Sequence, residues 1–366
     1  MLPNRAPRLY QNRKVLRAAI LVGSVLMSLT MAEVLLRALG FSYHLYPEKV
    51  QFGWPDPTIM EALYKPDPDL FWVVKNYEQQ LKFARWQQPE MIFMGDSCTE
   101  YGQFFEPLVG KIESIYPQKQ AHYFNFGTAG WSSYQGLRQL ERDIIPLEPR
   151  ILFIRFGVND LWRGFGLQDK QVSELTRSPM YKLQNLRLVQ LFNWAWVSRT
   201  SASPDAETIN GHLPRVSPDD FRQNLERMIR IARRHDIRPV LVTAPTGYER
   251  GNEPEYLAER HLKDLSMLIP LMRKYAEIVR EVADRMGVPL CDLRRHFKQI
   301  PIATRQDHYF LKDCIHLSPE GDQVVAGQLF ECMRKYGLIE ELFGGAAPRD
   351  GKTQAREDFG LRCPST

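Results

Sequence analysis

Short apolar segments alternate with helical patterns between residues 90 and 343, and this alternation constrains the fold most. Five segments have the length and apolar content of buried strands: Met91–Met94, His122–Phe126, Arg150–Phe156, Arg238–Thr243 and Val288–Leu293. Parallel strands that are covered on both faces are continuous apolar runs, and helices join them. The sequence therefore predicts an α/β fold in which helices cover both faces of a five-stranded parallel sheet.

Two of the helices between these strands can be placed from their apolar spacing. Apolar residues recur at helical spacing from Phe221 to Ala232, directly after Ser217 and Pro218. Serine is a favoured N-cap and proline a favoured first helical residue, so a helix is expected to begin there. A second long helical pattern runs roughly from Leu257 through Met286.

The N-terminus predicts a membrane anchor. Residues 1–17 are basic, residues 18–32 are uncharged and mostly apolar, and Val34–Leu36 extend this stretch towards the ~20 residues that span a bilayer. Basic residues stay in the cytoplasm, so residues 1–17 are expected there, 18–39 in the bacterial cytoplasmic membrane and the rest in the periplasm. Glu33 and Arg37 are expected to pair at the far interface. A signal peptide cleaved after Ala32 is the alternative.

The remaining sequence divides into four segments. Residues 40–88 are rich in proline and aromatic residues and read as an irregular connector, and residues 89–343 form the expected catalytic domain. Within it, residues 161–216 are an aromatic-rich insertion that either packs over the domain, shapes a cleft or touches the membrane. Residues 344–366 have little apolar content and are expected to be disordered.

Composition narrows the class of function. The net charge of +5 is small for 366 residues, and no basic stripe with interleaved aromatic residues supports nucleic-acid binding. The five cysteines lack CxxC spacing, which argues against a disulfide framework and a zinc site. Cys98 and Cys314 border motif residues, and the sequence leaves open whether they bond. The chain has no Walker A loop and no Gly-x-Ser-x-Gly elbow.

Four polar motifs occur in a fixed order, three of them directly after predicted strands. They are Gly95-Asp96-Ser97-Cys98-Thr99, Asn125-Phe-Gly-Thr-Ala-Gly130, Gly157-Val-Asn159-Asp160 and Asp313-Cys314-Ile315-His316. The carboxyl ends of parallel strands meet at one edge of a sheet, where α/β proteins place their chemistry. We therefore expect these motifs to converge. Asp96 is expected to stabilise the turn that carries Ser97. Asp160 is expected to cap or to form hydrogen bonds with backbone groups.

The motifs contain the groups that acyl transfer requires. The Ser97 hydroxyl must lose a proton during attack, and histidine is the usual acceptor. His316 needs a partner that holds its other ring nitrogen, and Asp313 lies three residues before it. The negative charge of a tetrahedral intermediate needs hydrogen-bond donors. The Ser97 N–H, the Gly130 N–H and the Asn159 amide are the candidates.

These motifs resemble the four blocks of the SGNH (GDSL-type) esterase superfamily over residues 88–340. The resemblance implies that Ser97 is the nucleophile, that His316 is the base oriented by Asp313, and that Gly130 and Asn159 are oxyanion donors. It also implies a flavodoxin-like three-layer sandwich with strand order 2-1-3-4-5 and a reaction without a cofactor.

The chain departs from the usual family pattern beside the nucleophile. Cys98 stands where the family often has leucine. The family glycine usually comes four residues after the serine, whereas here it comes five residues after Ser97, at Gly102. The N-terminal anchor, the connector ending in Pro66-Asp-Pro68 and the insertion look like those of a membrane-anchored bacterial subgroup.

We therefore expect a serine esterase that hydrolyses esters through an acyl-enzyme. Its expected substrates are O-acetyl esters of exported or cell-surface polysaccharide. An O-acyltransferase that uses the same triad is one alternative, because a sugar hydroxyl can replace water as acceptor. A non-catalytic carbohydrate-binding or assembly protein that keeps the fold is the other.

Overall fold

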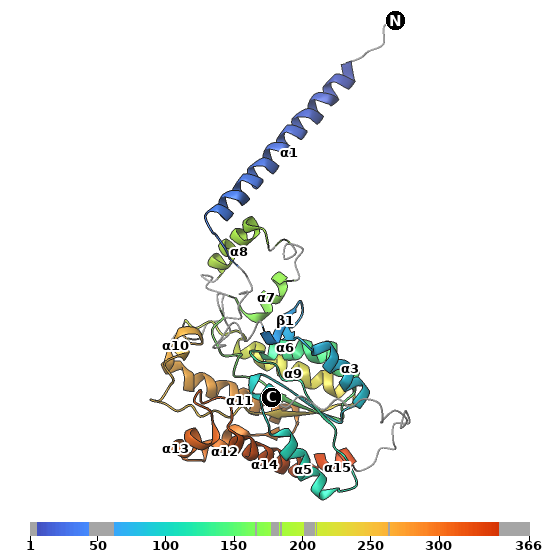
Figure 1. The fold of residues 1–366 in the computed structure, drawn as a ribbon, viewed down its shortest axis with the longest axis vertical. Helices are drawn as coiled ribbons and strands as arrows, with labels where there is room; N and C mark the ends of the chain where they lie inside the picture. Colours follow the sequence, from blue (N-terminus) through green and yellow to red (C-terminus); the bar gives the residue numbers. More distant parts are fainter. Residues whose placement is uncertain are drawn as a thin grey trace.

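The centre of the molecule is a five-stranded parallel sheet with helices on both faces (Figure 1). The computed structural model describes residues 6–43, 62–164, 167–176, 183, 185–200, 209, 211–262 and 264–343. The strands have the order β4-β3-β5-β6-β7 and are β3 Met91–Gly95, β4 Tyr123–Asn125, β5 Ile151–Arg155, β6 Arg238–Val242 and β7 Leu290–Cys291. Within this sheet the order along the chain is 2-1-3-4-5, which confirms the predicted fold.

Alternate side chains of the central strands face two separate helical layers, because successive residues of a strand point to opposite faces. On β5, Leu152 and Ile154 pack with the first layer, and Ile151 and Phe153 pack with the second. The first layer contains α3 Tyr77–Gln87, α6 Ser133–Gln139, α9 Pro218–Arg234 and α11 Leu268–Met286. The second contains α5 Phe105–Ile115, α12 Leu293–Lys298, α14 Pro319–Lys335 and α15 Leu338–Phe343.

Short helical elements complete the domain around these layers. They are α4 Ser97–Glu100, η1 Leu140–Ile144, η2 Ile145–Leu147, α7 Asp169–Thr176, α10 Leu257–Arg260, η4 Leu265–Met267, α13 Ile302–Thr304 and η5 Arg305–Tyr309.

One predicted helix is confirmed and the other is interrupted. The helix predicted after Ser217 is α9, and the Ser217 side chain accepts a hydrogen bond from the backbone of Asp220. The pattern over 257–286 is not one helix, because α10 ends at Arg260 and α11 begins only at Leu268. Asp264 caps the short helix η4 before α11 and so starts a new helical segment. Apolar spacing alone does not reveal such a restart.

The connector is regular in its described part, which corrects the expectation of an irregular segment. Residues 64–67 (β1) and 71–74 (β2) form an antiparallel hairpin that leads into α3. Phe71 and Trp72 are buried in the core beside the first helical layer. Asp67 accepts hydrogen bonds from two turn residues, which closes the hairpin. Proline in a strand such as β1 hides this structure from a sequence reading.

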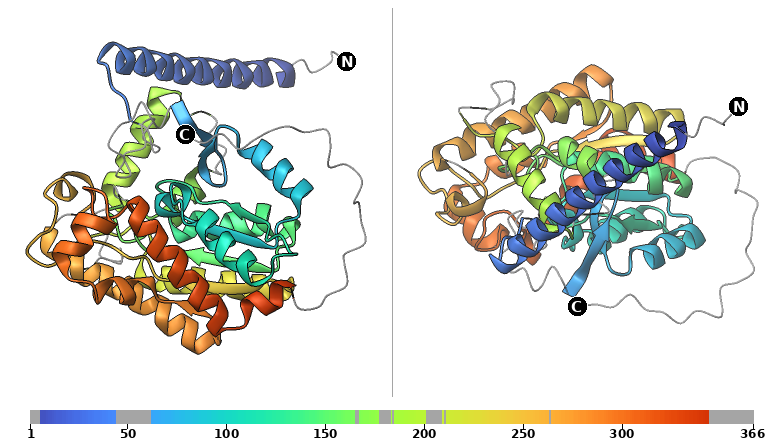
Figure 2. Two further views of the ribbon diagram at one scale, coloured as in Figure 1. Left: turned by 60° about the horizontal axis from the view of Figure 1, so that its bottom comes forward. Right: turned by 90° about the horizontal axis from the view of Figure 1, so that it is seen from above.

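Helix α1, Ala6–Ala38, extends away from the domain (Figure 1). Its segment Val15–Ala38 is long and apolar enough to cross a membrane, and none of it is buried in the protein. Glu33 and Arg37 form the predicted ion pair at 2.8 Å. The end of α1 also lies against α8, Arg187–Thr200, in the insertion (Figure 2).

One disulfide joins Cys291 of β7 to Cys332 of α14, which corrects the inference from cysteine number and spacing against disulfides. The two cysteines are 41 residues apart, so no short spacing marks them. Packing of the second helical layer on the sheet brings them together. Cys98 and Cys314 are both free thiols. The tail predicted to be disordered, residues 344–366, lies outside the described residues, as do 1–5 and 44–61.

Candidate active site

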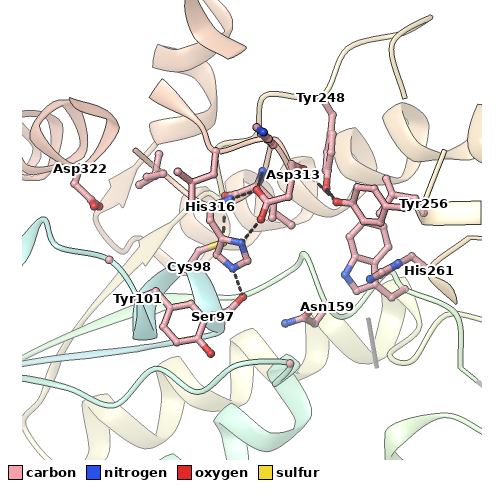
Figure 3. A pocket seen from close by; sticks show the side chains of 18 of the residues that line it. Ser97, Cys98, Tyr101, Asn159, Tyr248, Tyr256, His261, Asp313, His316 and Asp322 are labelled. Carbon is pink, nitrogen blue, oxygen red and sulfur yellow. Dashed lines mark hydrogen bonds and ion pairs between the residues drawn. The ribbon is translucent and has the colours of Figure 1, made fainter. Parts of the chain in front are cut away.

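The four motifs meet in one cavity at the carboxyl edge of the sheet (Figure 3). The cavity has a volume of about 930 Å³, which is in the usual range for a small-molecule site. Its lining includes all five residues proposed from sequence, Ser97, Gly130, Asn159, Asp313 and His316. The structure therefore brings together every site residue that the sequence analysis named.

Ser97 is the first residue of α4, directly after strand β3. Asp96 is the N-cap of this short helix, and its carboxylate accepts a hydrogen bond from the Cys98 N–H at 3.0 Å. Asp96 thus braces the turn, as expected. A Cβ at Gly95 would collide with the side chain of Thr99, so glycine permits the tight passage from strand to helix.

A continuous line of hydrogen bonds runs from Ser97 through His316 to Asp313 (Figure 3). Ser97 Oγ lies 2.9 Å from His316 Nε2, and His316 Nδ1 lies 2.6 Å from Asp313 Oδ2. The other carboxylate oxygen, Oδ1, accepts from the backbone N–H groups of Ile315 and His316, each at 3.0 Å. This arrangement holds the imidazole with Nε2 facing the serine hydroxyl.

The environment of Asp313 favours its ionised form. Burial raises the pKa of this carboxyl, but the hydrogen bond and charge of His316 and two backbone N–H groups outweigh it and lower the pKa below its ordinary value. An ionised Asp313 accepts a hydrogen bond from the His316 Nδ1–H, which keeps the proton on Nδ1. Nε2 is then the nitrogen that can take a proton from Ser97.

The three residues expected to supply oxyanion donors, Ser97, Gly130 and Asn159, all line the cavity. Gly130 has a φ of +76°, and a Cβ there would lie 3.0 Å from the Trp72 ring, so glycine suits this position. Asn159 Nδ2 donates one hydrogen to the Trp131 carbonyl at 3.0 Å, and an amide nitrogen carries a second hydrogen. Figure 3 shows the Asn159 amide beside Ser97, whose own N–H is the third donor. This geometry suits an oxyanion.

Comparison with known proteins identifies the family. Residues 93–324, more than half of the chain, match the profile of the GDSL-like lipase/acylhydrolase family. The chain belongs to this family. The GDSL-like protein is therefore a hydrolase that acts on ester bonds, and the SGNH (GDSL-type) resemblance is confirmed.

Individual relatives of this GDSL-like hydrolase are distant. The uncharacterized lipoprotein YqeF of Bacillus subtilis (strain 168) is 24% identical over 213 residues, which cover 55% of this chain and 69% of YqeF. An acetylxylan esterase of Geobacillus stearothermophilus is 26% identical over 93 residues, which cover 21% of this chain and 42% of that enzyme. The match thus spans less than half of the second relative.

Solved structures that are similar to this chain include a lipase/acylhydrolase and an acetyl xylan esterase. A lipase/acylhydrolase from Enterococcus faecalis has 15% identity and a TM-score of 0.43, and the alignment covers 68% of this chain and 96% of that one. The acetyl xylan esterase Axe2 from Geobacillus stearothermophilus has 16% identity and a TM-score of 0.41, with 66% and 93% covered.

Three elements of the GDSL-like hydrolase hold the backbone around Gly130. Trp72 Nε1 of β2 donates to the Ala129 carbonyl at 2.9 Å, and the Ala129 N–H donates to Glu100 at 2.5 Å. Arg215 of the insertion donates to the Gly130 carbonyl at 2.6 Å. The Ala129 carbonyl and the Gly130 N–H belong to one planar trans peptide and point in opposite directions. The Trp72 bond therefore orients the Gly130 N–H.

Arg215 is itself fixed by a fully buried ion pair. Its side chain and that of Asp169 are each only 1% exposed and lie 2.9 Å apart. Asp169 also accepts a hydrogen bond from Ser132 at 2.6 Å. Removing one partner of such a pair leaves a buried charge without compensation. The sequence analysis missed Trp72, Arg215 and Asp169, because no motif marks a residue that bonds a distant backbone carbonyl.

Glu100 lies behind the nucleophile and titrates near neutral pH. Burial raises the pKa of this carboxyl to about 7, although the hydrogen bonds from the Tyr64 hydroxyl and the Ala129 N–H lower it. Asp160 bonds backbone as expected, since it accepts from the N–H groups of Ser133 and Gly157.

The residues at which the chain departs from the family pattern fill space beside Ser97. The Cys98 thiol donates to the Ile315 carbonyl at 3.4 Å, and burial raises its pKa well above the ordinary value. It therefore stays protonated and acts as a small buried filler. Gly102 lines the cavity, and a Cβ there would collide with the ring of Phe104. Glycine at this position therefore permits close packing against Phe104.

The far wall of the cavity is aromatic (Figure 3). Trp162 comes from the insertion and packs edge-on against His261, and Tyr256 packs against the same ring. The Tyr256 hydroxyl donates to the Asp313 carbonyl at 3.2 Å, which ties this wall to the triad. Three roles were considered for the insertion, residues 161–216: packing over the domain, shaping the cleft or touching the membrane. Trp162 lines the cavity, so the insertion does help to shape the cleft. Among the described residues, no group of three or more His, Cys, Asp and Glu side chains could hold a metal ion.

Proposed function

We propose that this protein is a serine esterase in which Ser97 is the nucleophile. The observation that carries the proposal is the line of hydrogen bonds from Ser97 Oγ to His316 Nε2 and from His316 Nδ1 to Asp313, at 2.9 and 2.6 Å. A hydroxyl paired with a base that is itself oriented by a carboxylate is the arrangement of an activated nucleophile.

The reaction has two halves that use the same groups. Ser97 Oγ attacks the ester carbonyl carbon while His316 Nε2 takes the hydroxyl proton. The tetrahedral oxyanion accepts hydrogen bonds from the Ser97 and Gly130 N–H groups and the Asn159 amide. His316 then gives the proton to the leaving alcohol, and an acyl-enzyme remains. Water then attacks the acyl-enzyme while His316 takes one of its protons, and His316 returns this proton to Ser97 Oγ as the acid leaves.

We propose O-acetyl esters of exported or cell-surface polysaccharide as the substrates. An acetylxylan esterase is among the relatives, which supports an acetylated sugar polymer. The cavity is much larger than an acetyl group and has an aromatic wall formed by Trp162, Tyr248 and Tyr256. Such a wall can cover the apolar face of a sugar ring while the acetyl group lies at Ser97.

We propose that α1 anchors the protein in the cytoplasmic membrane and that the catalytic domain lies on the periplasmic side. The apolar segment Val15–Ala38 and the basic residues before it support this orientation. The Cys291–Cys332 disulfide agrees with an oxidising compartment. The relative YqeF is a lipoprotein, which agrees with a protein held at a membrane.

A panel of esters tests the proposed substrate. The full chain is assayed with aryl esters from acetyl to long acyl and with acetylated polysaccharide, and Ser97→Ala serves as the control. We expect the highest kcat/KM on acetyl esters and release of acetate from the polymer only by the wild type. A preference for long acyl chains, or no acetate from the polymer, would contradict the substrate. Transfer of acetyl to an added sugar acceptor in place of hydrolysis would identify an acyltransferase.

A further inference from the structure

Helix α8 exposes large aromatic side chains at the membrane end of the molecule. Phe192 is 62% exposed and Trp194 is 48% exposed, although neighbouring Val189 and Gln190 are buried in the domain. Each of these side chains leaves apolar surface in water, and because the two are two residues apart they project from different sides of the helix. Tryptophan is enriched at the membrane–water interface, at the level of the lipid headgroups.

Hydrogen bonds fix the start of α8 to the end of α1. The Glu33 carboxylate accepts from the backbone N–H groups of Arg187 and Leu188 at 3.0 and 2.9 Å. It thus caps the N-terminus of α8, where a negative charge is favourable. Arg37 pairs with the same carboxylate and donates to the Asn185 carbonyl at 3.2 Å. The two helices therefore meet at a defined point.

A second set of contacts holds the first turn of α8 in place. The Tyr43 N–H donates to the Gln190 side chain at 3.2 Å, and Arg187 donates to Ser42 at 3.2 Å. Figures 1 and 2 both show α8 between α1 and the catalytic domain. The segment that follows α1 is thus tied to the same helix as α1 itself.

The length of α1 places this junction near the headgroups. Val15–Ala38 has 24 residues, which at ~1.5 Å per residue span about 36 Å, against a hydrocarbon core of ~30 Å. The helix is longer than the core, and its C-terminal end carries the charged residues Glu33 and Arg37. Charged side chains near helix ends lie at the interface, so α8 begins at that level.

We propose that α8 lies in the membrane–water interface of the bilayer that α1 spans, with Phe192 and Trp194 among the lipid headgroups. The inference rests on the proposed anchoring by α1. In this position both exposed aromatic side chains lie at the level of the headgroups, and the exposed Arg199 lies near lipid phosphates. Two contacts with the membrane fix the tilt of the catalytic domain, whereas one spanning helix leaves it free to tumble.

Fluorine NMR of labelled tryptophans tests this contact on the full chain. The protein is labelled with 5-fluorotryptophan and reconstituted in nanodiscs of phosphatidylcholine and phosphatidylglycerol. Trp194→Phe and Trp86→Phe assign two of the seven tryptophan resonances. Trp86 is the matched control, because it is 53% exposed on α3, away from α8. Lipids with a nitroxide near the headgroup, or a water-soluble gadolinium chelate, are then added.

We expect the nitroxide lipid to broaden the Trp194 resonance beyond detection and to leave the Trp86 resonance unchanged. The gadolinium chelate should broaden Trp86 far more than Trp194. Equal response of both residues to the chelate would overturn the proposal, since Trp194 would then face water. Protection of Trp194 from both agents would also overturn it, because protein would cover the residue.

The same nanodiscs separate this proposal from the esterase proposal. Hydrolysis of an aryl acetate reports on the catalytic site, and flotation of the protein with the lipid reports on the anchor. A broadened Trp194 resonance without hydrolysis would support the α8 contact and contradict the esterase. Hydrolysis by a protein that does not float would contradict both the anchor and the α8 contact.

Discussion

Trp72→Phe tests whether the connector hairpin orients an oxyanion donor. The indole Nε1 of Trp72 donates to the Ala129 carbonyl at 2.9 Å, and the Gly130 N–H belongs to the same peptide plane. Phenylalanine keeps an aromatic ring in the core and removes this donor. The peptide then loses the bond that orients the Gly130 N–H.

The size of the effect follows from two limits. A buried carbonyl left unpaired costs ~1–3 kcal/mol, and loss of a whole oxyanion donor lowers kcat by roughly 10²–10³. Glu100 still holds the Ala129 N–H, so the peptide keeps part of its orientation. We therefore expect kcat to fall about 10- to 100-fold, equivalent to ~1.4–2.8 kcal/mol, with little change in KM, because the bond acts on the transition state.

Tyr77→Phe is the matched control for this experiment. Tyr77 is buried to the same degree as Trp72, and its hydroxyl donates to Asp143 at 2.8 Å, so this variant also keeps an aromatic ring and loses one buried donor. Both variants should lower the midpoint of thermal unfolding by similar amounts, measured by circular dichroism. Only Trp72→Phe should lower kcat strongly on an aryl acetate. Equal losses of kcat in the two variants, or an unchanged kcat in Trp72→Phe, would refute the reasoning.

Three further predictions follow from other residues of the structure. Asn159→Ala should lower kcat by roughly 10²–10³ with KM nearly unchanged in steady-state assays, as for one oxyanion donor; a drop below tenfold would contradict its role. The pKa of Glu100 is raised to about 7, so the folded state holds a proton that the unfolded state has lost above its ordinary pKa of 4.5. The free energy of unfolding should therefore decrease as pH rises from about 4.5 to 7. Glu100→Gln should remove the contribution of Glu100 to this decrease, as measured by thermal unfolding at several pH values; parallel pH curves for wild type and variant would contradict the raised pKa of Glu100. Reducing the Cys291–Cys332 bond, which closes a loop of 41 residues, should lower the free energy of unfolding by about 4 kcal/mol, measured by denaturant titration with and without reductant; a Cys291→Ala/Cys332→Ala variant that keeps full stability would contradict it.

The residues that were predictable from sequence are those that follow strands. Ser97 and Asn159 lie in the turns that follow β3 and β5, whose apolar runs are visible in the sequence. The edge of a parallel sheet brings such positions together, and Asp313 and His316 are linked by their short spacing. The catalytic residues were therefore predictable, because they lie in motifs whose position in the fold follows from the strands.

The residues that support the site were not predictable in this way. Trp72, Arg215 and Asp169 come from the connector and the insertion, and each acts through bonds to groups distant in sequence. Such bonds depend on tertiary packing, which no spacing reports. Strand β7 was expected over residues 288–293 and covers only Leu290–Cys291, because it pairs with β6 alone at the edge of the sheet.

The most direct test of the account is covalent labelling of the nucleophile. The folded wild type is incubated with a fluorophosphonate, and intact mass and peptide mapping locate the adduct. We predict a single adduct on Ser97, no adduct on Ser97→Ala, and much slower labelling of His316→Ala, because the imidazole activates the hydroxyl. A folded wild type that remains unlabelled, or an adduct on a different residue, would contradict the claim that Ser97 is the nucleophile.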